Sequence, residues 1–95
     1  MPYSLIIKEE AIQDLQVVYD YYEEQKSGLG ERFLDLIELH LEQVQANPLH
    51  YPIKKKTFRE AVVKKFPFII VFEMEQDTLV VYAIFHTFRN PVRKP

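Results

Sequence analysis

Cysteine is missing from this chain of 95 residues. Disulfide bridges and thiolate metal sites are therefore excluded, and the composition fits a reducing compartment. Long apolar runs are missing too, because no stretch approaches the roughly 20 apolar residues that a membrane-spanning helix needs. The N-terminal apolar run covers only residues 5–7, which is too short for a secretory signal. We expect a cytoplasmic protein with no membrane association.

Basic residues are scarce in the first half of the chain. Residues 1–52 carry three Lys and Arg against ten Asp and Glu, a net charge of −7. Residues 53–95 carry nine against four, a net charge of +5. This split is typical of a basic working face opposite an acidic back, or of two surfaces that each solvate their own half. With 47% hydrophobic residues, we predict a single domain over residues 1–95.

Glycine occurs only twice, and both glycines lie in the segment SGLG at residues 27–30. Before this segment, apolar residues recur at helical spacing: Ala11, Leu15, Val18 and Tyr22. After it, the same spacing runs over residues 31–46, through Phe33, Leu34, Ile37, Leu41 and Val44, until Asn47 and Pro48 end the pattern. The sequence therefore predicts two antiparallel helices joined by a tight turn.

Four strands are predicted around this hairpin, over residues 3–7, 59–65, 67–75 and 78–88. The polar connector at residues 48–58 is predicted to be a loop. The last strand is apolar on both faces, which favours an interior position in the sheet. We predict an α+β fold of order β-α-α-β-β-β, with the hairpin on one face of a small, mainly antiparallel sheet. The basic tail at residues 90–95 is a candidate for disorder.

Six short segments then suggest a family. They are AIQDL (11–15), YDYYEE (19–24), GLGERFL (28–34), QANPLHYP (45–52), KKFPF (64–68) and VYAIFHTFRNP (81–91). In this order the chain resembles the RelE/ParE toxins of bacterial type II toxin–antitoxin modules, nearer the ParE-like, plasmid-stabilisation branch. The resemblance implies a growth-inhibiting toxin that a cognate antitoxin neutralises by wrapping it with a helix and often an added strand. The target would be DNA gyrase, or mRNA on the ribosome.

Two residues are candidates for catalysis. The imidazole of His86 can act as a general acid or base near neutral pH, and the guanidinium of Arg59 can clamp a phosphate. Together they would suit a metal-free endoribonuclease, in which cations stabilise the transition state. Regular alternation places Tyr82, Ile84 and His86 on one face of the last strand, and Arg89 on the other. The competing interpretation of His86 is a buried imidazole bonded to the backbone.

The remaining candidates bind a target or a phosphate rather than react: Arg89, Lys64, Lys65 and Arg93. Arg89 can instead pair with Glu60 or Asp77. The histidines and acids do not reach metal-ligand spacing, so we predict neither a metal nor a cofactor. The pI of about 5.9 favours a gyrase-binding toxin over a protein that grips ribosomal RNA. The two alternatives are a ribosome-dependent endonuclease using His86 and Arg59, and an inactive member that serves only in autoregulation.

Overall fold

The computed structural model of the chain describes residues 3–63 and 68–86. The predicted basic tail at residues 90–95 lies outside this part. Neither described helix is long and apolar enough to cross a membrane. In chain order the elements are β1 (Ser4–Ile7), α1 (Glu9–Gln25), α2 (Leu29–Ala46), the 3-10 helix η1 (Pro48–His50), β2 (Ile53–Lys55), β3 (Phe58–Val63), β4 (Phe68–Glu75) and β5 (Thr78–His86).

The predicted turn between the two helices is confirmed, and both glycines are needed for it. Gly28 has a φ of 90°, a left-handed conformation that residues with a Cβ rarely adopt. Gly30 packs so tightly that a Cβ would lie 2.7 Å from Cγ of Glu23 and 2.9 Å from the ring of Tyr19. The Glu23 carboxylate accepts the N–H groups of Gly28 and Gly30, at 2.8 and 3.2 Å. One side chain of α1 therefore satisfies backbone donors at the start of α2.

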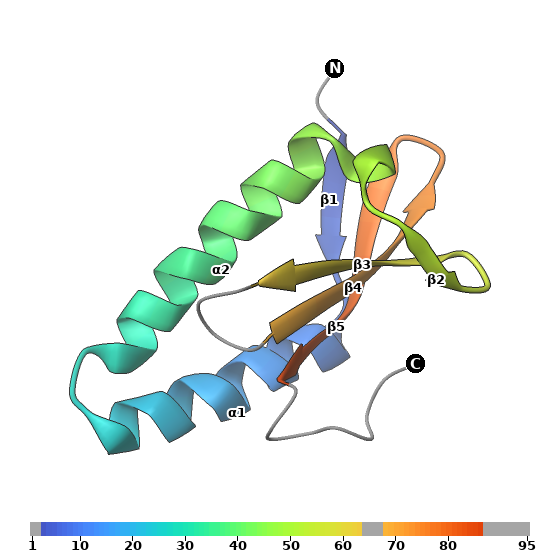
Figure 1. Ribbon diagram of the computed structural model, residues 1–95. Helices are drawn as coiled ribbons and strands as arrows, with labels where there is room; N and C mark the ends of the chain where they lie inside the picture. Colours follow the sequence, from blue (N-terminus) through green and yellow to red (C-terminus); the bar gives the residue numbers. More distant parts are fainter. Residues whose placement is uncertain (1–2, 64–67, 87–95) are drawn as a thin grey trace.

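The sheet has five strands in the order β1-β5-β4-β3-β2. All neighbouring pairs are antiparallel except β1 and β5, which are parallel. The α1–α2 hairpin lies along one side of this sheet (Figure 1). The predicted α+β fold is confirmed, and β5 has a neighbour on each side, as its apolar faces indicated.

The sequence predicted a loop at residues 48–58, and this prediction is wrong. The segment contains η1 and the short strand β2, which pairs antiparallel with the start of β3. All three β2 residues are exposed, and the pairing shifts register between Ile53 and Lys55. A strand with no buried face shows no alternation of polar and apolar residues, so the pattern that identifies strands was absent.

The core fills the space between the hairpin and the sheet. Phe33 of α2 stacks on Phe68 of β4 with 4.5 Å between ring centroids, which joins the two layers. Buried side chains from α1, α2, β3, β4 and β5 complete the core: Ala11, Val18, Ile37, Leu41, Val44, Ala61, Val63, Ile70, Phe72, Leu79, Val81 and Ile84.

Asp14 connects α1 to the edge of β5. β1 pairs only with residues 78–81, so it leaves the same edge of β5 without a strand neighbour further along. There Oδ2 of Asp14 accepts the backbone N–H of Ile84 at 3.1 Å. Asp14 is only 5% exposed. Its carboxylate therefore takes the place of a strand partner and satisfies a backbone donor inside the protein.

β5 contains a bulge that overturns one prediction. Val81 lies opposite Phe72 and Ala83 opposite Val71, so Tyr82 is an extra residue in β5. A bulge shifts the side-chain alternation by one residue. Ile84 is buried in the core, whereas the Tyr82 hydroxyl bonds to Glu73, whose neighbours Phe72 and Met74 pack toward the core. The prediction that Tyr82 and Ile84 share a face is therefore wrong.

We expect Asp14→Ala to lower the free energy of unfolding by about 1–3 kcal/mol, because it removes the acceptor of a buried N–H group. Urea unfolding followed by circular dichroism measures the change. Asp20→Ala is the matched control, since Asp20 lies exposed on the same helix. The control should change stability by less than about 0.5 kcal/mol. Equal stabilities of the two variants would contradict the structural role of Asp14.

Candidate functional site

Arg59, the predicted phosphate clamp, lies half-buried in β3. Its Nη1 donates a hydrogen bond to the carbonyl oxygen of Tyr51 at 2.6 Å. The ring of Tyr51 packs edge-on against Phe72 of β4, with 5.9 Å between centroids. Arg59 therefore holds the segment before β2 against the sheet. A guanidinium has five N–H donors, so this one bond does not exhaust its capacity to bind an anion.

His86, the predicted acid or base, is the last residue of β5 and lies opposite Phe68 of β4. Arg59 lies opposite Phe72 on the other side of the same strand. Phe68 and Phe72 are four residues apart, which is about 14 Å along a strand. The backbone therefore does not bring the two predicted catalytic residues together.

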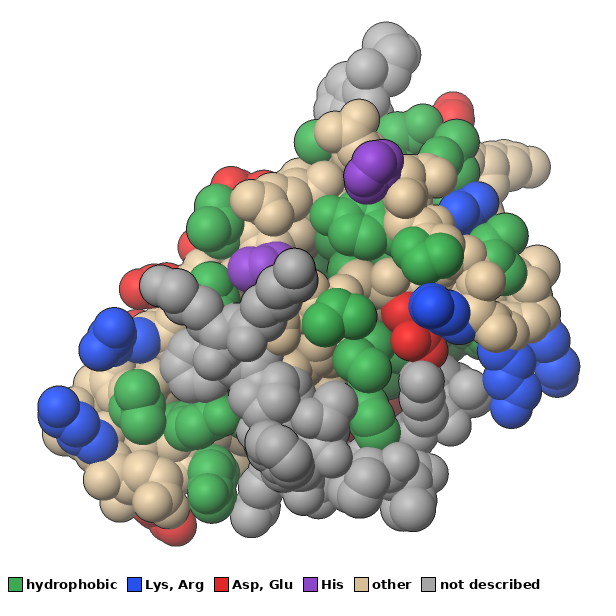
Figure 2. Space-filling view, in the orientation of Figure 1, with side chains coloured by type: hydrophobic (Ala, Val, Ile, Leu, Met, Phe, Trp, Pro, Cys, Tyr) green, Lys and Arg blue, Asp and Glu red, His purple; other side chains and the backbone are tan. Residues whose placement is uncertain are grey.

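Three consecutive lysines lie at the β2 edge of the sheet. Lys54 and Lys55 of β2 and Lys56 of the following turn are all exposed. Figure 2 shows Lys and Arg side chains at this end of the molecule and a second group at the opposite end. The four predicted target- or phosphate-binding residues, Lys64, Lys65, Arg89 and Arg93, lie outside the described residues.

A cluster of aromatic and acidic groups surrounds Tyr82 on the sheet face opposite the core. The Tyr82 hydroxyl lies 3.2 Å from Oε1 of Glu73 and 3.2 Å from Oε2 of Glu75. Thr57 also donates its hydroxyl hydrogen to Glu73. The ring of Phe58 meets the Tyr82 ring edge-on at 5.0 Å, and Nζ of Lys8 lies 5.3 Å from the ring centroid. We call these residues the Tyr82 cluster.

The electrostatics of the Tyr82 cluster keep the phenol protonated. Desolvation raises the pKa of Tyr82 above its ordinary value of 10.0, and the negative charges of Glu73 and Glu75 raise it further. At neutral pH the Tyr82 hydroxyl therefore donates its hydrogen, which is shared between the two carboxylates, and it does not act as a base. Two carboxylates beside an aromatic ring repel phosphate and attract cationic or hydrogen-bonding groups. We call the sheet face opposite the core the open face. Its part around Tyr82 suits recognition of a protein better than binding of RNA.

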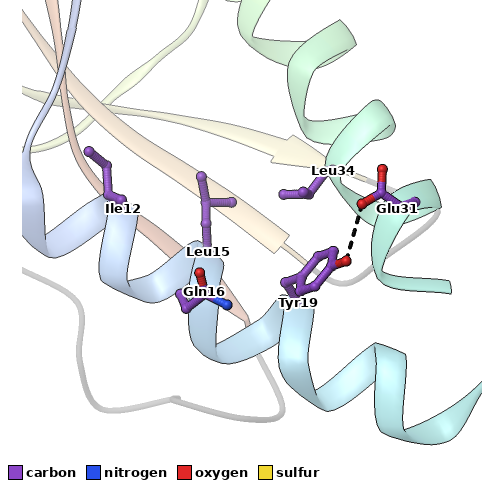
Figure 3. A pocket seen from close by; sticks show the side chains of 6 residues that line it. All are labelled: Ile12, Leu15, Gln16, Tyr19, Glu31 and Leu34. Carbon is purple, nitrogen blue, oxygen red and sulfur yellow. Dashed lines mark hydrogen bonds between the residues drawn. The ribbon is translucent and has the colours of Figure 1, made fainter. Parts of the chain in front are cut away.

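A second candidate surface is a cleft between α1 and α2, of about 230 Å³. Figure 3 shows Tyr19 of α1 reaching across it, where its hydroxyl donates to Oε2 of Glu31 at 3.1 Å. That hydrogen bond raises the pKa of Tyr19 above 10.0, with desolvation as a smaller cause. The other lining residues are Ile12, Leu15, Gln16 and Leu34. The cleft combines an apolar floor with one acidic edge.

The carboxylates and the phenol of the Tyr82 cluster have a partial signal in the sequence. The alternation Phe72, Glu73, Met74, Glu75 places both carboxylates on one side of a strand. From the sequence, Tyr82 was placed on a face with Ile84 and His86, as a residue that could stack on a base. The bulge that brings the Tyr82 hydroxyl to them has no sequence signal. Among residues 3–63 and 68–86, no group of three His, Cys, Asp or Glu side chains is placed to hold a metal ion.

Comparison with known proteins identifies the family. The family model for the ParE toxin of the type II toxin–antitoxin system parDE matches residues 5–91. No curated protein matches the chain in sequence.

Solved structures share the fold at low sequence identity. A chromosomal ParDE toxin–antitoxin system from P. aeruginosa matches with a TM-score of 0.80 and 18% identity, covering 88% of this chain and 95% of the other. The intact E. coli RelBE toxin–antitoxin complex matches with a TM-score of 0.65 and 12% identity, over the same 88% and 95%. A mutant E. coli RelE toxin in the free state matches with a TM-score of 0.59 and 13% identity, covering 92% and 85%.

We expect Glu73→Gln to lower the pKa of Tyr82, because the substitution removes a negative charge that disfavours the phenolate. NMR titration of ¹³C-labelled tyrosine rings measures this pKa, and Tyr82→Phe assigns the signal. Glu42→Gln, a change of an exposed acid on α2, should leave it unchanged. A Tyr82 pKa that is the same in the wild type, Glu73→Gln and Glu42→Gln would rule out the proposed interaction with Glu73.

Proposed function

Because this chain belongs to the family of ParE toxins of type II toxin–antitoxin systems, we propose that it arrests growth by binding DNA gyrase in the cytoplasm. A cognate antitoxin encoded beside it would neutralise it. The family supplies the toxin role, and the choice of target rests on the surfaces of the described residues.

The placement of Arg59 and His86 carries the choice of target. A metal-free nuclease needs an acid, a base and a phosphate clamp converging on one phosphate. Here Arg59 bonds to the Tyr51 carbonyl, and the register separates it from His86 by four residues along β4. On the other face of the sheet, opposite the core, Glu73 and Glu75 add negative charge. These observations favour a toxin that acts by binding a protein over one that cleaves RNA.

The charge distribution also supports an acidic neutralising partner. The exposed lysines of β2 and the following turn, Lys54, Lys55 and Lys56, form a basic edge beside Arg59. An acidic segment that folds on binding would be attracted to this edge, and its affinity would fall with rising salt. We propose that the cognate antitoxin covers at least this part of the chain.

Induced expression in bacteria separates the three hypotheses. A gyrase-binding toxin should arrest growth, leave cellular mRNA intact in primer-extension mapping and remain toxic as His86→Ala. The reason is that binding needs no acid or base at residue 86. His50→Ala, which changes an exposed histidine of η1, is the matched control.

Two results would contradict the gyrase proposal. Codon-phased mRNA cuts that disappear in His86→Ala would identify an endoribonuclease with His86 in its site. Normal growth at a verified level of folded protein would identify an inactive member that serves in autoregulation. Melting curves of the purified variants establish that His86→Ala is folded, so that lost toxicity is not mistaken for lost structure.

A further inference from the structure

The two edges of the sheet are protected to different degrees. β2 is three residues long, has a shifted register and carries Lys54 and Lys55, all of which oppose pairing with another chain. β1 has the sequence SLII, with no charge, no proline and a regular register. Its residue Ile6 is 53% exposed. Although β1 is also short, its edge therefore carries fewer of the features that oppose strand addition than the β2 edge does.

The backbone of β1 leaves a short stretch open for pairing. The N–H groups of Ser4 and Lys8 donate to the carbonyls of Asp77 and Val81, each at 2.9 Å. Because a strand directs alternate residues to opposite sides, Ser4, Ile6 and Lys8 face β5, whereas Leu5 and Ile7 direct their N–H and C=O groups outward. The part of the chain that the structure describes supplies no backbone partner for these outward groups.

The neighbouring positions on this side of the sheet are closed by side chains. Gln45 of α2 donates its amide hydrogen to the carbonyl oxygen of Tyr3, just before the open stretch. Asp14 of α1 accepts the N–H of Ile84, beyond the end of β1. The outward edge of β1 is thus closed at Tyr3, ends where α1 begins at Glu9, and is open over Leu5–Ile7. This open stretch defines a docking site three residues long.

We propose that the β1 edge pairs with the β1 edge of a second copy of this chain, antiparallel, with the two-fold axis at Ile6. This register sets Leu5 opposite Ile7 of the second copy, and Ile7 opposite Leu5. Both residues direct their backbone groups outward, so the two pairs form four hydrogen bonds. The two Ile6 residues face each other in a non-hydrogen-bonded pair, where Cα atoms approach to about 4.5 Å.

A second copy suits this edge because the stretch is self-complementary. An axis at Ile6 pairs outward-directed residues only with each other, and it buries two exposed isoleucine side chains against one another. No like charges lie opposite across Ser4–Ile7, whereas a pairing of two β2 edges would oppose lysine to lysine. The contact is far smaller than the roughly 1,200 Å² of a stable interface, so the dimer should be weak and concentration-dependent.

Cysteine cross-linking tests the register directly, because the chain has no cysteine of its own. In Ile6→Cys the two thiols of a dimer lie within disulfide reach, since a bridge needs Cα atoms about 4.4–6.8 Å apart. We expect disulfide dimers under mild oxidation of the purified full chain. Ser4→Cys should give none, because the two Ser4 positions lie about 14 Å apart in this register. A mixture of Ser4→Cys and Lys8→Cys should cross-link as a heterodimer.

Val62→Cys is the control for random collision, because Val62 is 60% exposed but lies in β3, which has a strand on each side. Equal cross-linking of Ile6→Cys and Val62→Cys would overturn the proposal.

Sedimentation equilibrium over a range of concentrations gives an independent test, in which Ile6→Lys should weaken dimerisation at least tenfold and Val62→Lys should not. A chain that stays monomeric throughout and does not cross-link would also overturn the proposal. Neither result depends on whether the target is gyrase.

Discussion

The hydrogen bond between Asp14 and Ile84 is the constraint on which the rest of the fold depends. β1 covers only the first four residues of β5, and the later part of the same β5 edge needs another acceptor. A buried donor without one costs about 1–3 kcal/mol. Asp14 supplies the acceptor from α1, so this side chain bonds the helical hairpin to the sheet beside the apolar core and satisfies β5 on its way to His86.

The sequence predicts the elements whose residues alternate between a buried and an exposed side. The periodic apolar residues of α1 and α2 and the paired glycines identify the hairpin, and the apolar runs identify β3, β4 and β5. β2 was missed because all of its residues are exposed. The bulge at Tyr82 was missed for the opposite reason. β5 is apolar on both faces, so inserting one residue leaves its pattern unchanged.

The candidate site was predictable in its residue types but not in its geometry. Arg59 and His86 are suitable groups for phosphate chemistry, yet their separation depends on the register of β3 and β5 against β4, which no local pattern reports. The Tyr82 cluster likewise requires the bulge before the phenol can reach Glu73 and Glu75. The side chains on the open face therefore favour recognition of a protein because of how the strands align, and not because of composition alone.

The central claim is that this ParE-family chain acts on gyrase by binding, without RNA cleavage. The most direct measurement adds the purified chain to DNA gyrase and relaxed plasmid, and follows supercoiling and DNA breakage on gels. Supercoiling should fall with rising toxin concentration, and adding the cognate antitoxin should restore it. Undisturbed supercoiling at a large molar excess of folded toxin, together with mRNA cleavage in a translating extract, would contradict it.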